Sequence, residues 1–201
     1  MNVPNKITMC RIIMSVFLMV LLIFPIEKVG LVFPSFEIVA SKGTIILDTK
    51  YIVCGIIFLV AALTDFLDGF LARKYNIVTD FGKVLDAIAD KTLVNGVLII
   101  FATSGIISPI YPVVIIFRDT IVDSIKMIAG QKAGAVGASK TGKIKTVFML
   151  VGLTLTFFHN LPFELININV SNILLLIATV LSVVSGIEYY IKNKKYFADV
   201  K

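Results

Sequence analysis

Six long apolar stretches dominate this sequence and limit what the chain can fold into. They cover Ile7–Ile26, Tyr51–Leu71, Lys83–Thr103, Ile106–Ile128, Thr146–Phe163 and Val170–Ile191. A bilayer core is about 30 Å thick, so a helix of about 20 mostly apolar residues crosses it. With 58% hydrophobic and 16% charged residues, the chain lacks the polar residues that a soluble domain needs for its surface. We therefore predict an all-α, polytopic membrane protein with six transmembrane helices, forming a single domain over residues 1–201.

Basic residues are unevenly divided between the two sides of these predicted spans. The side of the N-terminus carries Lys6, Arg11, Arg73, Lys74, Lys132, Lys140, Lys143, Lys145, Lys192, Lys194, Lys195 and Lys201. The opposite side carries Lys28, Lys42 and Lys50. Because Lys-rich and Arg-rich loops stay in the cytoplasm, we expect both termini there. The net charge of +6 then indicates contact with anionic membrane lipids and not with nucleic acid.

Four aspartates lie near the ends of the second and third predicted spans. Asp65 and Asp68 are three residues apart, and Asp86 and Asp90 are four apart, so each pair shares a helix face. A short turn, about Lys74–Phe81, brings the two helix ends together. Four converging carboxylates would repel one another strongly in a medium of low dielectric constant. Divalent cations would remove that repulsion, and oxygen ligands favour Mg²⁺ or Mn²⁺.

The alternative is a structural ion network in which these aspartates pair with nearby cations. The candidate cations are Arg73, Lys74, Lys83 and Lys91. Such a network accounts for the charges, but it does not account for Gly69 and Gly82 on the same helix faces. Ionisable residues within membrane spans usually serve a function, so we favour the metal site.

The same segment carries eight residues in a fixed pattern, D-x2-D-G-x2-A-R-x8-G-x3-D-x3-D, which runs from Asp65 to Asp90. This pattern resembles the signature of the CDP-alcohol phosphatidyltransferases. The resemblance implies that Asp65, Asp68 and Asp86 hold two divalent ions on the pyrophosphate of a CDP-linked lipid. It implies that Asp90 is the general base and also touches a metal ion. The active site would then lie at the cytoplasmic membrane interface of a bacterium.

The resemblance also assigns residues to the CDP-linked lipid. By position these are Gly69, Ala72, Arg73, Thr79 and Gly82. The N-terminal segment, which includes Pro4, resembles the opening of bacterial family members that use glycerol 3-phosphate. There Asn5, Thr8 and Arg11 would face the nucleotide from the first span. The alternative is that they form an interfacial cap with an arginine that reaches toward the lipid headgroups.

Two further segments indicate the acceptor alcohol. The fourth span contains Arg118-Asp119, where the same bacterial proteins usually have Arg-Glu, and Lys126, where they have a second Arg. Residues 137–146 resemble their Gly-Lys-x-Lys-Thr stretch. The resemblance implies an acceptor-phosphate site, and its residues are Arg118, Lys140, Lys143 and Lys145. The alternative for each lysine is ordinary cytoplasmic loop charge.

The expected reaction is transfer of a phosphatidyl group from CDP-diacylglycerol to sn-glycerol 3-phosphate, catalysed by a homodimer as in related proteins. Within the family, the alternative acceptors are an inositol phosphate, serine or phosphatidylglycerol. Outside it, an intramembrane prenyltransferase would place its two aspartate motifs far apart in the chain. A small cation transporter would place its acidic residues near the bilayer midplane, often between internal repeats.

Overall fold

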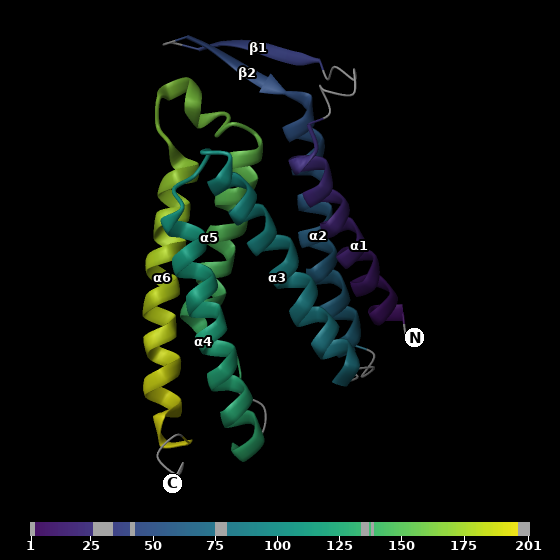
Figure 1. Ribbon diagram of the computed structural model, residues 1–201, viewed down its shortest axis with the longest axis vertical. Helices are drawn as coiled ribbons and strands as arrows, with labels where there is room; N and C mark the ends of the chain where they lie inside the picture. Colours follow the sequence, from purple (N-terminus) through teal and green to yellow (C-terminus); the bar gives the residue numbers. More distant parts are fainter. Residues whose placement is uncertain are drawn as a thin grey trace.

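The computed structural model describes residues 3–25, 34–40, 43–74, 80–133, 137 and 139–196. Within these ranges the chain forms six α-helices, one β-hairpin and two short 3₁₀ turns (Figure 1). The helices are α1 (Val3–Ile23), α2 (Thr49–Lys74), α3 (Asp80–Thr103), α4 (Ile110–Ala133), α5 (Lys140–Phe157) and α6 (Val170–Asn193). Each predicted apolar stretch lies mainly within one of them, so the mostly helical fold is confirmed.

Two of these helices are long and apolar enough to cross a membrane. Among the described residues, they are the segments Asn5–Ile23 in α1 and Val170–Tyr196, which joins α6 to the 3₁₀ turn η3 (Lys194–Tyr196). Both segments have a mean hydropathy of 2.2 over their most apolar window. The structure therefore identifies two membrane-crossing candidates.

The β-hairpin corrects the all-α prediction. Strands β1 (Ser35–Ala40) and β2 (Gly43–Asp48) pair antiparallel, from Ser35 opposite Asp48 to Ala40 opposite Gly43. β-Branched side chains in both strands favour an extended backbone. The hairpin lies across one end of the helical bundle, at the top of Figure 1. A search for long apolar stretches does not detect strands this short.

Several helix ends differ from the predicted spans, because a helix continues beyond its apolar part. α5 begins at Lys140, six residues before the predicted start at Thr146, and its basic residues therefore lie on helical turns. The hydroxyl of Ser139 caps this helix by accepting a hydrogen bond from the Gly142 amide at 3.0 Å. α1 begins at Val3, before the predicted start at Ile7.

The end of α3 also limits where α4 begins. Gly105, at φ +73°, adopts the left-handed conformation just after α3, and the Ile106 amide bonds back to the Phe101 carbonyl at 2.9 Å. A side chain would strain this backbone, which glycine adopts freely. α4 consequently starts at Ile110 and not at Ile106 as predicted.

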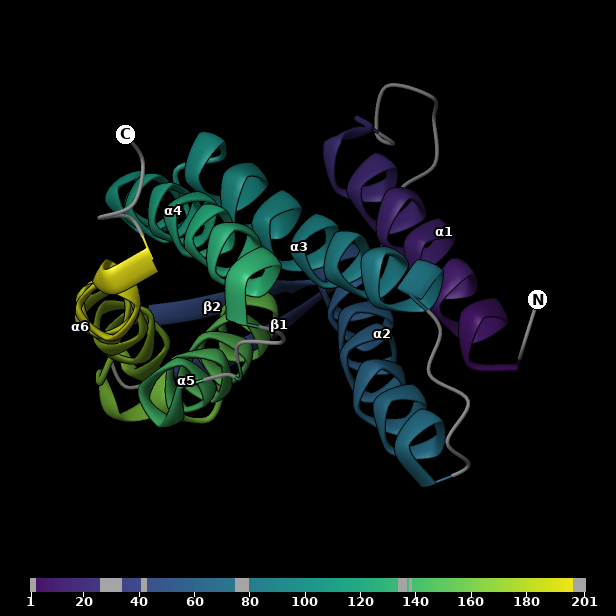
Figure 2. The same cartoon turned by 90° about the horizontal axis from the view of Figure 1, so that it is seen from below.

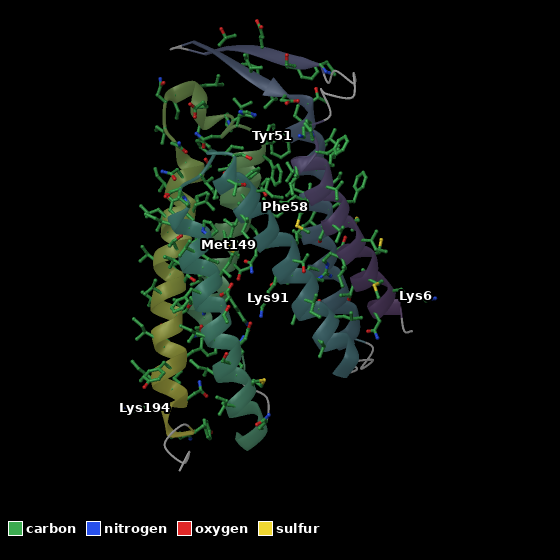
Figure 3. All side chains as sticks on the ribbon, viewed as in Figure 1. Lys6, Tyr51, Phe58, Lys91, Met149 and Lys194 are labelled. Carbon is green, nitrogen blue, oxygen red and sulfur yellow. The ribbon has the colours of Figure 1, made fainter. Side chains whose placement is uncertain are left out.

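The helices form two groups that meet in a core near the hairpin. α1 packs against α2 and α3, whereas α6 packs against α4 and α5 (Figures 1 and 2). Between the groups, the centre of the buried Phe157 ring lies 5.3 Å from that of Phe58, at a tilt, and 4.7 Å from that of Phe101, in an edge-to-face contact. The start of α1 and the end of α6, marked by Lys6 and Lys194 in Figure 3, lie at the opposite end from the hairpin.

Candidate active site

Arg11 of α1 joins two of the predicted metal-binding aspartates. Its Nη1 donates hydrogen bonds to Oδ1 of Asp65 in α2 and, at 3.2 Å, to Oδ1 of Asp86 in α3. The arginine side chain is completely buried, while the side chains of Asp65 and Asp86 are 40% and 50% exposed. The fold therefore brings residues 11, 65 and 86 together, and the expected convergence of α2 and α3 carboxylates occurs for this pair.

The face of α1 that carries Arg11 also carries two other predicted site residues. Asn5 and Thr8 are buried, and the positions of Asn5, Thr8 and Arg11 are spaced three residues apart. That spacing places all three on one side of the helix. Gly82, in the first turn of α3, is partly buried. α1 thus carries Asn5, Thr8 and Arg11 on one side, and Arg11 contacts both α2 and α3 through Asp65 and Asp86.

Other predicted residues of this region are described only in part. The structure places Asp68, Gly69, Ala72 and Arg73 on the α2 backbone, without describing their side chains. Thr79 lies outside the described residues. Their assignment to metal ions and to the CDP-linked lipid stays a prediction.

The oxygen ligands that the structure describes have the chemistry that a divalent cation prefers. Two carboxylate oxygens, from Asp65 and Asp86, converge on one positively charged nitrogen, which is where a hard cation would also be stabilised. Within the described side chains, no group of three acidic, His or Cys residues is close enough to hold a metal ion. A complete site would need the side chain of Asp68 or a movement of Asp90.

Asp90 lies one helical turn after Asp86 and lines a separate cavity of about 280 Å³. The cavity lies between α3, α4, α5 and α6, and Arg118, Lys143 and Lys145 also line it. A carboxylate from α3 therefore faces the same space as four cations from α4 and α5, of which the fourth is Lys126. Lys140, which was grouped with these cations, is exposed and does not line the cavity.

Asp119 holds two of the cavity cations in place. Its Oδ1 accepts hydrogen bonds from Nη1 of Arg118 at 2.7 Å and from Nζ of Lys145 at 2.9 Å. Lys145 is buried, so the carboxylate provides the charge that its burial requires. The other acidic residue of α4, Asp123, likewise pairs with a cation, Lys91 of α3 (Figure 3 labels Lys91).

Sequence reasoning missed how these charges are paired. The alternative of a structural ion network paired Lys91 with the four aspartates, whereas the structure pairs Lys91 with Asp123. Sequence reasoning did not identify Arg11 as the partner of Asp65 and Asp86. The available signal was a single arginine within an apolar span, since such a residue usually has a buried partner. Glu188 of α6 accepts a hydrogen bond from the Thr141 hydroxyl of α5 at 2.8 Å, which no local pattern indicated.

Comparisons with known proteins agree with the motif. The family model described as CDP-alcohol phosphatidyltransferase matches residues 1–184. A Bacillus subtilis protein named CDP-diacylglycerol–glycerol-3-phosphate 3-phosphatidyltransferase is 35% identical over 192 residues, which is 96% of this chain and 95% of that protein. A Rickettsia typhi protein of the same name is 30% identical over 197 residues, covering 98% of this chain and 99% of the relative. The chain therefore belongs to the CDP-alcohol phosphatidyltransferase family, which is a family of membrane-bound enzymes.

Proposed function

We propose that this protein transfers a phosphatidyl group from CDP-diacylglycerol to sn-glycerol 3-phosphate, giving phosphatidylglycerophosphate and CMP. One observation carries the choice of acceptor, which is that Asp90 lines the same cavity as Arg118, Lys143 and Lys145. Glycerol 3-phosphate carries a hydroxyl and a phosphate on one short chain. Its hydroxyl can therefore meet Asp90 while its phosphate meets the cations. The names of the nearly full-length relatives support the same reaction.

In the proposed reaction, the Asp90 carboxylate takes the proton of the acceptor hydroxyl. The hydroxyl oxygen forms a bond to the phosphorus that carries the diacylglycerol. The bond from this phosphorus to the bridging oxygen of the pyrophosphate breaks, and CMP leaves with the electron pair. Two divalent ions, Mg²⁺ or Mn²⁺, held by Asp65, Asp68, Asp86 and Asp90, would neutralise the pyrophosphate charge.

The CDP-linked lipid is assigned to the region where α1, α2 and α3 meet. Support comes from α1, where the buried residues Asn5 and Thr8 lie on the same side of the helix as Arg11. Gly69, Ala72, Arg73, Thr79 and Gly82 complete this proposed binding region. The lipid tails would remain in the bilayer while the diphosphate reaches the aspartates.

For the arrangement in the membrane, we propose six spans of one domain in the bacterial cytoplasmic membrane, with both termini in the cytoplasm, and a homodimer. Support comes from Lys6 and Lys194, which lie at the same end of the bundle (Figure 3), and from the basic residues that predict a cytoplasmic location for that end. Labelling of single introduced cysteines from either side of the membrane tests the orientation. Cross-linking in native membranes tests the dimer.

A screen of acceptors tests the function directly. Purified protein in lipid nanodiscs would receive CDP-diacylglycerol and, separately, glycerol 3-phosphate, an inositol phosphate, serine or phosphatidylglycerol. We expect CMP release with glycerol 3-phosphate and its loss when EDTA is added. Faster release with another acceptor would replace the proposed one. Metal-dependent ion flux without any CMP would favour a transporter.

A further inference from the structure

Helix α6 holds Arg118 by contacts from successive turns. Nε of Arg118 donates a hydrogen bond to the Ser182 carbonyl at 3.1 Å, and Nη2 donates one to the Ser185 hydroxyl at 2.6 Å. The guanidinium also lies 5.7 Å from the centre of the Tyr189 ring. With the bond from Nη1 to Asp119, each of its three nitrogens has a protein partner.

Small residues on α6 make this close approach possible. Ser182 and Ser185 are completely buried. A Cβ atom added to Gly186 would lie 3.1 Å from Cγ of Arg118 and 3.7 Å from Nε. That contact is tighter than normal packing, so a larger residue at position 186 would push the arginine away from α6. The α6 cradle, meaning Ser182, Ser185 and Gly186, fits the arginine by shape and by hydrogen bonding.

The cradle leaves donors available for an anion. A guanidinium has five N–H groups, and the contacts to Ser182, Ser185 and Asp119 use three of them. Two therefore remain, one on each terminal nitrogen. A guanidinium held rigidly loses less side-chain entropy when it binds phosphate than one that moves freely.

We propose that the α6 cradle positions Arg118 and thereby sets the affinity for the acceptor phosphate without itself touching the substrate. This inference rests on the proposed function, since it takes Arg118 to be a phosphate ligand. Ser185 and Gly186 are accordingly positioning residues. They act on the acceptor, whereas the CDP-linked lipid lies with α1, α2 and α3.

Two variants test the cradle, each with a matched control. S185A removes the hydroxyl that holds Nη2, and its control is T179A, because the buried Thr179 hydroxyl bonds only within α6, to the Leu175 carbonyl. G186A crowds Arg118, and its control is G152A, where a Cβ would lie 3.1 Å from Leu175 at the α5–α6 contact. The two glycine variants thus have the same closest approach of 3.1 Å at different places, and the control is the more crowded of the two.

Steady-state kinetics and direct binding are the measurements. S185A and G186A should each raise KM for glycerol 3-phosphate about tenfold, the usual effect of losing one hydrogen bond to a charged group. KM for CDP-diacylglycerol should change less than about twofold in the same variants. Calorimetric titration with inorganic phosphate should show the same loss of affinity without turnover. T179A and G152A should leave both KM values unchanged.

A double-mutant cycle separates positioning from a general structural role. In an R118K background, S185A should have little further effect, because the lysine has no guanidinium for the hydroxyl to hold. Equal increases in both KM values, unchanged phosphate affinity in S185A and G186A, or full additivity with R118K would each overturn the inference. A wild-type protein that binds phosphate but turns over a different acceptor would instead overturn the proposed acceptor and leave the cradle intact.

Discussion

Methionine in place of Arg11 keeps an unbranched side chain of similar length but removes the buried positive charge. Nη1 of Arg11 bonds Oδ1 of Asp65 and, at 3.2 Å, Oδ1 of Asp86. At an effective dielectric constant of about 20, two unit charges at this separation attract by about 5 kcal/mol. Because both carboxylates are about half exposed, solvent reduces each contribution to about 1–2 kcal/mol. We therefore expect R11M to lower the free energy of unfolding by about 3 kcal/mol.

The chain itself offers an assay for this loss. It contains no tryptophan, but Cys54 is completely buried in the core and Cys10 is exposed. In a C10S background, a thiol-reactive dye would report unfolding when Cys54 becomes accessible. A loss of about 3 kcal/mol should lower Tm by about 6–12 °C for a chain of this size.

The same variant links Arg11 to the proposed metal site. Without the arginine, Asp65 and Asp86 repel each other with less compensation, so Mg²⁺ should raise Tm by more in R11M than in the parent. R11K keeps the charge but puts it on a shorter side chain and a strongly hydrated ammonium, so its Tm in EDTA should be intermediate. An R11M protein that melts in EDTA within about a degree of the parent, or an equal shift of both proteins by Mg²⁺, would contradict this role of Arg11.

Three further changes have defined outcomes. D90N should abolish CMP release while leaving CDP binding nearly unchanged, because the amide cannot accept the proton; near-normal turnover would exclude Asp90 as the base. K145M should raise KM for glycerol 3-phosphate at least about tenfold, whereas K140M should change it little, since Lys140 does not line the cavity; equal effects in kinetic assays would contradict this. F157A should cost about 3–5 kcal/mol of stability in the thiol-dye assay, and V147A, on the exposed side of α5, should cost far less.

Local sequence patterns predict much of this protein because the bilayer restricts the possible backbone. Long apolar segments are expected to be helical in a membrane, where the backbone must satisfy its own hydrogen bonds, and hydropathy alone located parts of all six described helices. Residue spacing along a helix is equally local. The spacing in the motif therefore placed Asp65 with Asp68, and Asp86 with Asp90, on common helix faces.

Hydropathy is less informative at the ends of helices and outside them. The first turns of α5 are polar, so the apolar window missed them, and their helical state depends on the cap at Ser139. The hairpin formed by Ser35–Ala40 and Gly43–Asp48 depends on pairing between two short strands. Such strands have weak signals of their own.

Only the tertiary structure decided which charges are partners. Arg11 donates hydrogen bonds to Asp65, which is 54 residues away in the sequence, and to Asp86, which is 75 residues away. Arg118 donates one to Ser185, which is 67 residues away. The sequence determined that Arg11 and Arg118 each lie within a long apolar stretch and need compensation, because an isolated charge in apolar surroundings is costly. Which partner compensates it depends on how the helices rotate and pack against one another, and no local pattern records that rotation.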